Sequence, residues 1–296
     1  MKKKLGQYAL ATGAGAVRRL QVLHDVYSTV GRRVLLQAGF ARGTKVADFG
    51  CGVGVVTRML AEMVGPSGRV TGIDVNEAQL EQASALCRKD NLTNVSFLAA
   101  SACDTGLPRD SFDLVYCRFL LLHLPDPVAC LREMRRVLKP GGIVVIEDGD
   151  LNSAGSIPPT ANDAFADLFG RLAPIRGVDY SLANNLYHLV KAVGFSDTNL
   201  EIHQPALVRG ENRYLLKWSV EEAGPAFVDA GLVTADQLEE IVSAMQDAIE
   251  DPNVLILAPR MSLVWGRKAA EAAESQVHRM TMNGSRFREP VLISVS

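Results

Sequence analysis

One stretch near the start of the chain decides the fold: Val46-Ala47-Asp48-Phe49-Gly50-Cys51-Gly52-Val53-Gly54. Its pattern predicts an apolar strand that runs into a loop with glycine at every second position. The helix expected next has apolar residues at i, i+3, i+4 and i+7, namely Val56, Met59, Leu60 and Met63. A second apolar strand, over residues 70–74, then ends in Asp74. This order of elements is typical of a nucleoside-binding α/β unit.

The spacing of the glycines and the two aspartates indicates which nucleoside the unit binds. A dinucleotide fold has Gly-x-Gly-x-x-Gly, but Val55 stands where its third glycine would fall. Asp48 would repel a pyrophosphate, whereas it would attract a sulfonium and an ammonium group. Asp74 can accept both hydroxyls of a ribose. The pattern therefore favours S-adenosylmethionine over NAD, with a glycine-rich turn that holds no ligand as the plainer alternative.

Four further segments follow in order along the chain. They are Ser111-Phe112-Asp113-Leu114-Val115-Tyr116, His123-Leu124-Pro125-Asp126-Pro127, Met134-Arg135-Arg136-Val137-Leu138-Lys139-Pro140-Gly141-Gly142 and Ile143-Val144-Val145-Ile146-Glu147-Asp148. With the glycine-rich loop, they resemble class I S-adenosylmethionine-dependent methyltransferases, in particular the domain shared by ubiquinone/menaquinone methylases and many small-molecule methylases. The resemblance is close over residues 40–150 and loose over 180–268.

The resemblance implies a Rossmann-like, three-layer α/β/α fold with a mostly parallel seven-stranded sheet, an antiparallel last strand and helical lid insertions. The alternation of strand-like and helical runs from residue 45 to 146 independently predicts a parallel, doubly wound sheet. Its expected strands cover residues 45–49, 70–74, 95–99, 112–117 and 142–147. Asn76 is expected to cap one helix, and Thr234 with Gln237 to form a capping box for another.

These elements divide the chain into three parts. Residues 1–40 are expected to form a cover of two helices, in which Tyr8, Arg18 and Arg19 either line the cofactor site or lie on an exposed helix face. Residues 41–268 form the methyltransferase domain, with lid insertions at about 152–180 and 210–250. Residues 269–296 form a tail without clear periodicity.

The composition limits the partners and the location. The chain has 296 residues, 48% of them hydrophobic, and a formal net charge of −2 with a pI of about 6.2. This balance offers no electrostatic footprint for nucleic acid, and no apolar run is long enough for a membrane span. The five cysteines are scattered and resemble reduced thiols, so we expect a cytoplasmic protein that acts on a small-molecule substrate. A homodimer stays open.

The resemblance also assigns candidate site residues. Those expected to bind S-adenosylmethionine, and its product S-adenosylhomocysteine, are Asp48, Gly50, Cys51, Gly52, Gly54, Asp74, Val75, Ser101, Ala102 and Arg118. The positions of other residues, rather than the resemblance, lead us to expect that they face the substrate: Tyr8 in the N-terminal cover, Asp148 after the fifth strand, and Tyr180, Asn184 and Tyr187, whose spacing by three or four places them on one helix face. Ser101-Ala102 stands where the family often has Asp-Ala on the adenine amino group. No metal is expected.

His123 is the candidate catalytic residue, because an imidazole can act as a general base near neutral pH. The alternative is a histidine that only fixes the His-Leu-Pro-Asp-Pro turn.

Two functions follow. The first is methyl transfer from S-adenosylmethionine to a small, partly apolar molecule, at a nitrogen, oxygen or carbon acceptor. The second is a non-catalytic S-adenosylmethionine-binding sensor or partner subunit. DNA base methylases often carry Asn/Asp-Pro-Pro-Tyr/Phe after the fourth strand, where this chain has Tyr116-Cys117-Arg118-Phe119.

Overall fold

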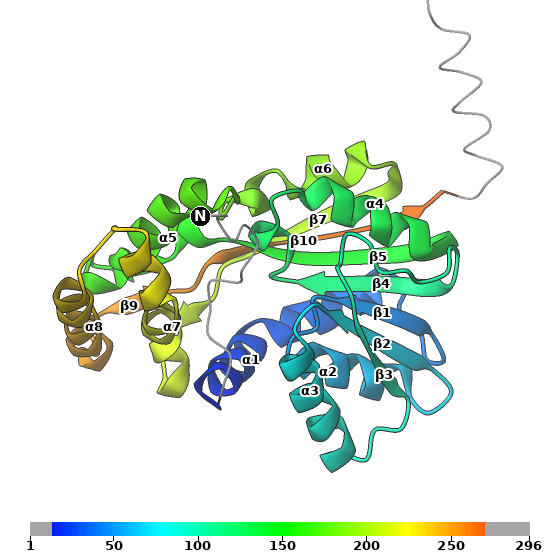
Figure 1. Cartoon of the computed structure of the whole chain (residues 1–296), viewed down its shortest axis with the longest axis horizontal. Coiled ribbons are helices and arrows are strands. Elements are labelled where there is room, and N and C mark those ends of the chain that lie inside the picture. The colour runs from blue at the N-terminus through cyan, green and yellow to red at the C-terminus, as the bar shows by residue number, and fades with distance from the viewer. Residues whose placement is uncertain (1–13, 270–296) are drawn as a thin grey trace, which may run out of the picture.

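The computed structural model describes residues 14–269, and a seven-stranded sheet forms its centre (Figure 1). The strand order is β3-β2-β1-β4-β5-β10-β7. The strands are β1 (Lys45–Phe49), β2 (Arg69–Asp74), β3 (Val95–Ala99), β4 (Phe112–Arg118), β5 (Leu138–Asp150), β7 (Phe195–His203) and β10 (Arg260–Lys268). Only β10 is antiparallel to its neighbours, β5 and β7. The predicted Rossmann-like α/β class with an antiparallel last strand is confirmed.

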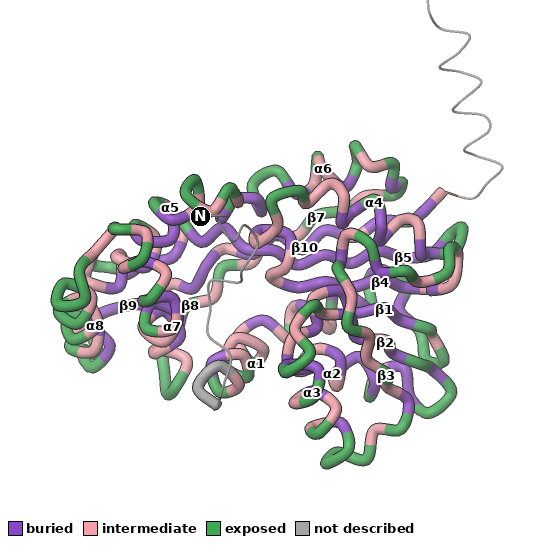
Figure 2. Tube along the Cα trace, viewed as in Figure 1, coloured by how far each residue is buried: buried purple, intermediate pink, exposed green. Residues whose placement is uncertain are grey.

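Helices cover both faces of this sheet. In Figure 1, α1 (Ala14–Gln37), α2 (Val55–Val64) and α3 (Glu77–Lys89) lie to the left of β2 and β3, while α4 (Pro127–Val137) and α6 (Leu186–Ala192) lie above β5. Central strands that are covered on both faces need apolar residues without alternation. β4 and β5 show this pattern, and Figure 2 colours the sheet as buried along its middle. Each covering helix buries the face that packs against the sheet and leaves its opposite face more exposed to solvent.

The helix starts follow the predicted caps. The Asn76 side chain accepts a hydrogen bond from the backbone N–H of Gln79 at the start of α3. Thr234 and Gln237 form the capping box at the start of α8 (Ala235–Glu250). Both predictions are confirmed, because a polar side chain placed before an apolar period satisfies backbone donors that the helix itself leaves open.

Several segments beyond β5 build a second lobe, on the left in Figure 1, while α6, β7 and β10 belong to the central sheet and its cover. The lobe contains α5 (Ala164–Arg176), α7 (Leu215–Asp229), α8 and a small sheet in the order β6-β9-β8. The strands of that sheet are β6 (Gly155–Ile157), β8 (Ala206–Leu207) and β9 (Leu255–Leu257). Short 3₁₀ turns occur in both parts of the molecule: η1 (Leu121–His123) between β4 and α4, η4 (Leu182–Asn184) before α6, and η2 (Leu151–Ser153), η3 (Ala161–Asp163) and η5 (Gly210–Tyr214) beside the elements of the lobe. The lobe thus comprises the segments expected as lid insertions.

In the described part of the N-terminal cover, the two apolar groups that were expected to lie on separate helices share one helix, α1, which runs from residue 14 to 37. Gly31 does not break it, and a Cβ atom there would lie 2.5 Å from Oε1 of the buried Glu147. The glycine therefore lets the helix approach the sheet. Tyr27 fastens α1 further by donating a hydrogen bond of 2.6 Å to the carbonyl of Pro259. Tyr8 and residues 270–296 lie outside the described part of the chain.

Within residues 14–269, no helix combines the length and the apolar character that crossing a bilayer requires.

Candidate functional site

A large cavity, with a volume of about 780 Å³, opens at the carboxyl edge of β1, β2 and β4. Its wall comes from the loop after β1, the start of α3, the turn after β4 and one side of α1. Ligands of open α/β sheets bind at this edge, where the strand order reverses between neighbouring strands. The sheet order places that reversal between β1 and β4. The cavity therefore lies where the fold predicts a nucleoside.

The glycine-rich loop forms the floor of this cavity. Gly50, Gly52 and Gly54 have φ angles of 69°, 53° and 76°, a left-handed region that residues with a Cβ atom rarely adopt. Gly50 and Cys51 donate their N–H groups to the carbonyl of Ile73, which ties the loop to β2. Gly50, Cys51 and Gly52 line the cavity. Gly54 lies behind it, where a Cβ atom would come within 2.8 Å of the Ala83 side chain on α3.

Asp74 ends β2 and stands in the cavity wall. Its Oδ2 accepts a hydrogen bond of 2.9 Å from Gly52 N–H, and its Oδ1 accepts one of 2.9 Å from Asn76 N–H. The half-buried carboxylate thus shapes the glycine loop, and each oxygen keeps acceptor capacity for a ligand. Val75 beside it is 71% exposed, which leaves an apolar surface free at the rim.

Asp48 lies behind the loop and does not belong to the cavity wall. It is 2% exposed, and its Oδ2 accepts a hydrogen bond of 2.6 Å from the Thr57 hydroxyl on α2. Burial raises the pKa of this carboxyl to about 7, although the Thr57 bond and Arg118 oppose the rise. Asp48 can therefore act on a ligand through its charge but without direct contact in this structure.

Arg118 closes the far end of the cavity from the end of β4. Its Nε donates to Glu147 Oε2 at 2.9 Å and to the Tyr116 hydroxyl at 3.0 Å. Burial works against the charge of Arg118, but the adjacent Glu147 outweighs it and raises the arginine pKa. His24 on α1 faces the same guanidinium, with 3.4 Å between His24 Nδ1 and Arg118 Nη1.

The protonation state and the tautomer of His24 follow from its burial and from the adjacent Arg118. Burial, and secondarily the charge of Arg118, lower the pKa of His24 to about 4, so the ring is neutral at neutral pH. Arg118 can only donate hydrogen bonds, so Nδ1 must accept and Nε2 carries the hydrogen. His24 therefore adds an N–H donor to a cavity wall to which the sequence analysis had not assigned it. Its position on the cover helix offered no motif by which to find it.

His123 is held at the cavity by Asp148. The fully buried Asp148 carboxylate accepts backbone hydrogen bonds from Leu121, Leu122 and Gly149, at 2.8, 3.2 and 3.0 Å. The first two donors begin the turn η1, which ends at His123. Asp148, expected to face the substrate, is therefore placed under the turn and not in the cavity wall.

The His123 ring stands edge-on to the Tyr180 ring, with 5.6 Å between the ring centroids. Burial lowers the pKa of His123 to about 3, and the charges of Arg176 and Arg19 add to this. The imidazole is consequently neutral in the absence of a ligand.

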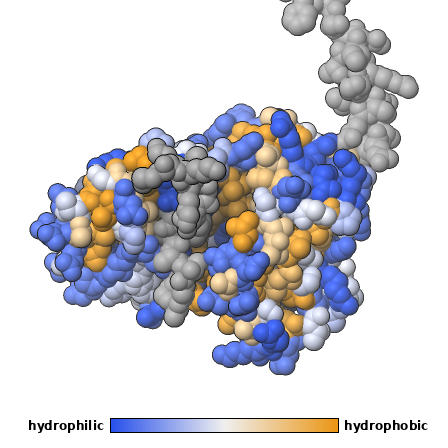
Figure 3. Space-filling model, viewed as in Figure 1, coloured by the Kyte–Doolittle hydropathy of each residue, from blue (hydrophilic) through white to orange (hydrophobic). Residues whose placement is uncertain are grey.

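A narrow second cavity of about 50 Å³ adjoins the first. The two share Arg19, Leu23, Phe119 and His123. Beyond these, the second cavity is walled almost entirely by apolar side chains of the lobe, including Leu151, Phe165, Phe169, Leu215 and Leu216. In Figure 3, hydrophobic side chains gather near the middle of this face, between the sheet body and the lobe. A polar nucleoside site therefore continues into an apolar extension.

The predicted substrate wall lies behind this extension. Tyr180 is 1% exposed, and its ring packs edge-on against the Phe169 ring at 5.5 Å. Tyr187 on α6 packs against His188 and lies under the Lys191 ammonium. Neither tyrosine lines either of these two cavities: the Tyr180 ring lies in the core, and the partly buried Tyr187 packs against the edge of the core.

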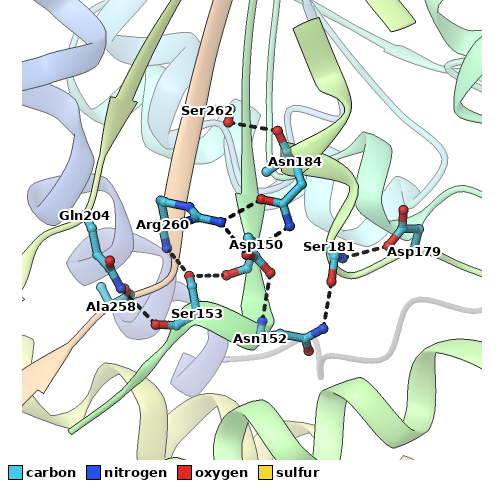
Figure 4. Close-up of polar contacts among 11 residues, drawn as sticks. Asp150, Asn152, Ser153, Asp179, Ser181, Asn184, Gln204, Ala258, Arg260 and Ser262 are labelled. Carbon is cyan, nitrogen blue, oxygen red and sulfur yellow. Dashed lines mark hydrogen bonds and ion pairs between the residues drawn. The ribbon is translucent and has the colours of Figure 1, made fainter. Parts of the chain in front are cut away.

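Asn184 belongs to a polar network instead (Figure 4). Its amide donates to Asp150 Oδ2 at 3.1 Å, and Arg260 donates to both Asp150 Oδ2 and Asn184 Oδ1, at 2.9 and 2.6 Å. Asp150 also accepts from Asn152 N–H in η2. The network fixes the turn whose Leu151 lines the second cavity, so its members shape the wall from behind.

The adenine-side pair also lies away from the wall. Ser101 is exposed, and its hydroxyl accepts from Cys103 N–H at 3.2 Å, while Ala102 is 9% exposed. At the corresponding end, the cavity is lined by Glu77, Ala78 and Gln79 from α3. Arg19 does line both cavities, whereas Arg18 is exposed and pairs with Glu211.

Within the described residues, no group of three or more His, Cys, Asp or Glu side chains is placed to hold a metal ion.

The sequence is similar to known methyltransferases. A family model described as a methyltransferase domain matches residues 40–187. Demethylmenaquinone methyltransferase from Staphylococcus aureus is 34% identical over 165 residues, an overlap that spans 56% of this chain and 66% of that protein.

Solved structures share the fold. A Bacillus halodurans protein assigned as a methyltransferase superposes with a TM-score of 0.57 at 20% identity, covering 80% of this chain and 98% of that one. Phosphoethanolamine N-methyltransferase 2 from Haemonchus contortus, in complex with phosphomonomethylethanolamine and S-adenosylhomocysteine, superposes with a TM-score of 0.52 at 18% identity. That match covers 85% of this chain and 52% of the other.

Proposed function

This chain belongs to the methyltransferase domain family, and we propose that it transfers the methyl group of S-adenosylmethionine to a small, partly apolar molecule. One observation supports the proposal most: a glycine-floored cavity with Asp74 in its wall continues directly into an apolar extension. The first space suits a nucleoside with a charged tail, and the second suits an apolar acceptor. The acceptor atom can be nitrogen, oxygen or carbon.

The residues of the large cavity fit S-adenosylmethionine. Asp74 offers carboxylate oxygens for the ribose hydroxyls, and exposed Val75 offers an apolar surface for the adenine ring. At the other end, the Nε2–H of His24 and the guanidinium of Arg118 provide positive or donating groups for the methionine carboxylate. Buried Asp48 would favour the positive charges of the same ligand through its field.

The chemistry needs little from the protein beyond alignment. When bound, S-adenosylmethionine supplies an electrophilic methyl group on a sulfonium that is already a good leaving group. The chain must hold the acceptor in line with that methyl and exclude water, effects that can supply about 7–11 kcal/mol. Helices α1, α5 and α7 enclose the junction of the two cavities and are suited to this task. We expect no obligatory catalytic triad.

We propose that His123 orients the acceptor at this junction and takes its proton only where the acceptor arrives protonated. A neutral imidazole can accept a hydrogen bond, but a pKa of about 3 opposes holding a proton. His123→Asn should therefore leave binding of S-adenosylhomocysteine unchanged and lower kcat/KM by less than the ~10²–10⁴-fold that a general base typically contributes. A larger loss, with the protein still folded, would assign the base role to His123.

The test of the function is isotope transfer. We would incubate the purified chain and a metabolite extract with S-adenosylmethionine labelled in its methyl group, and read the products by mass spectrometry. We expect a labelled small molecule that is absent when the chain is omitted. Tight binding of S-adenosylhomocysteine with no labelled product in any extract would instead favour a sensor or partner subunit.

The cellular location stays a proposal as well. All five cysteines are free thiols in the structure, which agrees with the reducing cytoplasm that the sequence led us to expect.

A further inference from the structure

Arg19 of α1 stands at the junction where the large cavity continues into the apolar extension. It is 3% exposed and shares this junction with Leu23, Phe119 and His123. A buried guanidinium is costly unless its N–H groups find acceptors. The acceptors around Arg19 therefore decide whether its burial is compensated.

Among the described residues, the hydrogen-bonding capacity of the Arg19 guanidinium is only partly satisfied. Its Nε donates a hydrogen bond of 2.8 Å to Glu222 Oε2 on α7, and the two side chains are 4% and 13% exposed. No acceptor is recorded for its two Nη groups among residues 14–269. The Ser219 hydroxyl, which also lines the extension, donates to the carbonyl of Leu215 within its own helix and receives no hydrogen bond from Arg19. Up to four N–H donors of Arg19 are thus left for a ligand.

Arg19 is the charged side chain that lines both cavities at the junction, and His123 beside it is neutral. Glu222 engages only its Nε, so the two Nη groups still present donors there. An ammonium placed against Arg19 would be repelled, whereas an oxyanion would be attracted and could take a bidentate hydrogen bond from its fork. The surrounding walls offer the rest of such a molecule only apolar contacts.

Building on the proposed function, we propose that Arg19 binds an oxyanion, a carboxylate or phenolate, on the methyl acceptor, whose apolar end enters the extension. Arg19 then selects acidic aromatic or aliphatic acceptors over neutral and cationic ones. Its bond to Glu222 orients the guanidinium and joins α1 to α7 across the bound molecule. This makes Arg19 a specificity-determining residue.

A simpler role would be that of a clasp, in which the Arg19–Glu222 ion pair only fastens α1 to α7. The two roles make different predictions for the two partners. A clasp is lost equally when either side is removed, whereas an anion site is lost only with Arg19. Glu222→Gln, which breaks the same ion pair and keeps the arginine, is therefore the matched control for Arg19→Gln.

The experiment uses the full chain saturated with S-adenosylhomocysteine and two probes of equal shape, 4-ethylbenzoate and its neutral amide, 4-ethylbenzamide. Calorimetry on the unmodified chain should give a dissociation constant about tenfold or more lower for the carboxylate than for the amide. Arg19→Gln should abolish this preference without changing the affinity for S-adenosylhomocysteine, and Glu222→Gln should keep it. Arg19→Lys, which retains the charge without the fork, should keep part of the preference and serves if Arg19→Gln does not fold.

Three results would overturn the proposal: equal affinity for the two probes, no binding of the carboxylate, or equal loss of the preference in Arg19→Gln and Glu222→Gln. None of these three results would contradict the proposed function. That function fails separately if the unmodified chain does not bind S-adenosylhomocysteine.

Discussion

Each carboxylate of the site does a different job because its surroundings differ. Asp74 stands in the cavity wall with both oxygens engaged by backbone N–H groups, while Asp48 and Asp148 are buried behind it. All three were singled out by position in the sequence. Only the structure separates the residue that can touch a ligand from those that act through their charge or through a turn.

Replacing Asp74 tests the first of these jobs. Asp74→Ala should weaken binding of S-adenosylhomocysteine by about 1.5–3 kcal/mol, since it removes charge-assisted hydrogen bonds to the ribose. This corresponds to roughly a 10- to 150-fold rise in the dissociation constant, measured by calorimetry. Glu81→Ala, which removes an exposed acid from the neighbouring helix α3 outside the cavity wall, is the control and should change nothing. Unchanged affinity in Asp74→Ala would remove Asp74 from the ribose site.

Asp48 makes a prediction about pH. With a folded-state pKa of about 7, it keeps its proton up to about neutral pH, whereas an unfolded aspartate releases it near pH ~4. Asp48 therefore lowers the stability of the ligand-free protein as the pH rises from about 4 to about 7. A cationic ligand reverses this preference by favouring the charged carboxylate, so S-adenosylmethionine should bind more tightly as the pH rises from about 6 to about 8.

Calorimetry at pH 7 in two buffers with different ionisation enthalpies counts the protons released on binding. We expect a release of about half a proton per molecule. Asp48→Asn should abolish it, and it should also remove the pH dependence of the affinity. Equal proton release in the two proteins would assign the titration to another group.

At the scale of elements, the helix α1 shows how a cover is built onto a sheet. It approaches β5 through Gly31, contacts the lobe through the Arg19–Glu222 pair, and reaches Pro259 through the Tyr27 hydroxyl. The same helix carries His24 and Arg19 to the two cavities. The packing of α1 against the sheet and the lobe therefore brings both residues to the site.

Gly31→Ala tests this docking. Alanine favours an isolated helix over glycine by about 1 kcal/mol, but its Cβ would lie 2.5 Å from Glu147 Oε1 and 3.1 Å from Arg118 Nη2. Because both atoms belong to a buried ion pair, we expect a net loss of about 1–3 kcal/mol in the free energy of unfolding, read from urea denaturation. The control, Thr29→Ala on the exposed side of the same helix, should be neutral or slightly stabilising. A stabilising Gly31→Ala would show that α1 is not seated against the pair.

At the scale of the whole molecule, the sequence predicted the repeating part of the fold well. The central strands and the caps of α3 and α8 follow from apolar runs and from local polar side chains, which need no knowledge of distant contacts. The extent of α1 did not follow from the sequence, because the close approach of Gly31 to Glu147 joins segments that are far apart in the chain.

The residues of the candidate site also divide into those that the sequence predicted and those that only the structure revealed. The glycine loop and Asp74 were found because a motif fixes their geometry within one strand–loop–helix unit. Ser101, Tyr180 and Tyr187 were placed by analogy or by helical spacing, and spacing alone cannot tell a core ring from a cavity wall. His24, Glu147 and the aromatic lining from α5 became visible only when segments far apart in the chain were brought together.

The central claim is that the glycine-floored cavity holds S-adenosylmethionine, and a crystal structure of the chain with S-adenosylhomocysteine tests it most directly. We predict density in this cavity, with the ribose hydroxyls on the Asp74 carboxylate, the adenine against Val75 and the amino-acid end near Arg118 and His24. Density for the ligand elsewhere, or in this cavity with the ribose away from Asp74, would contradict the account.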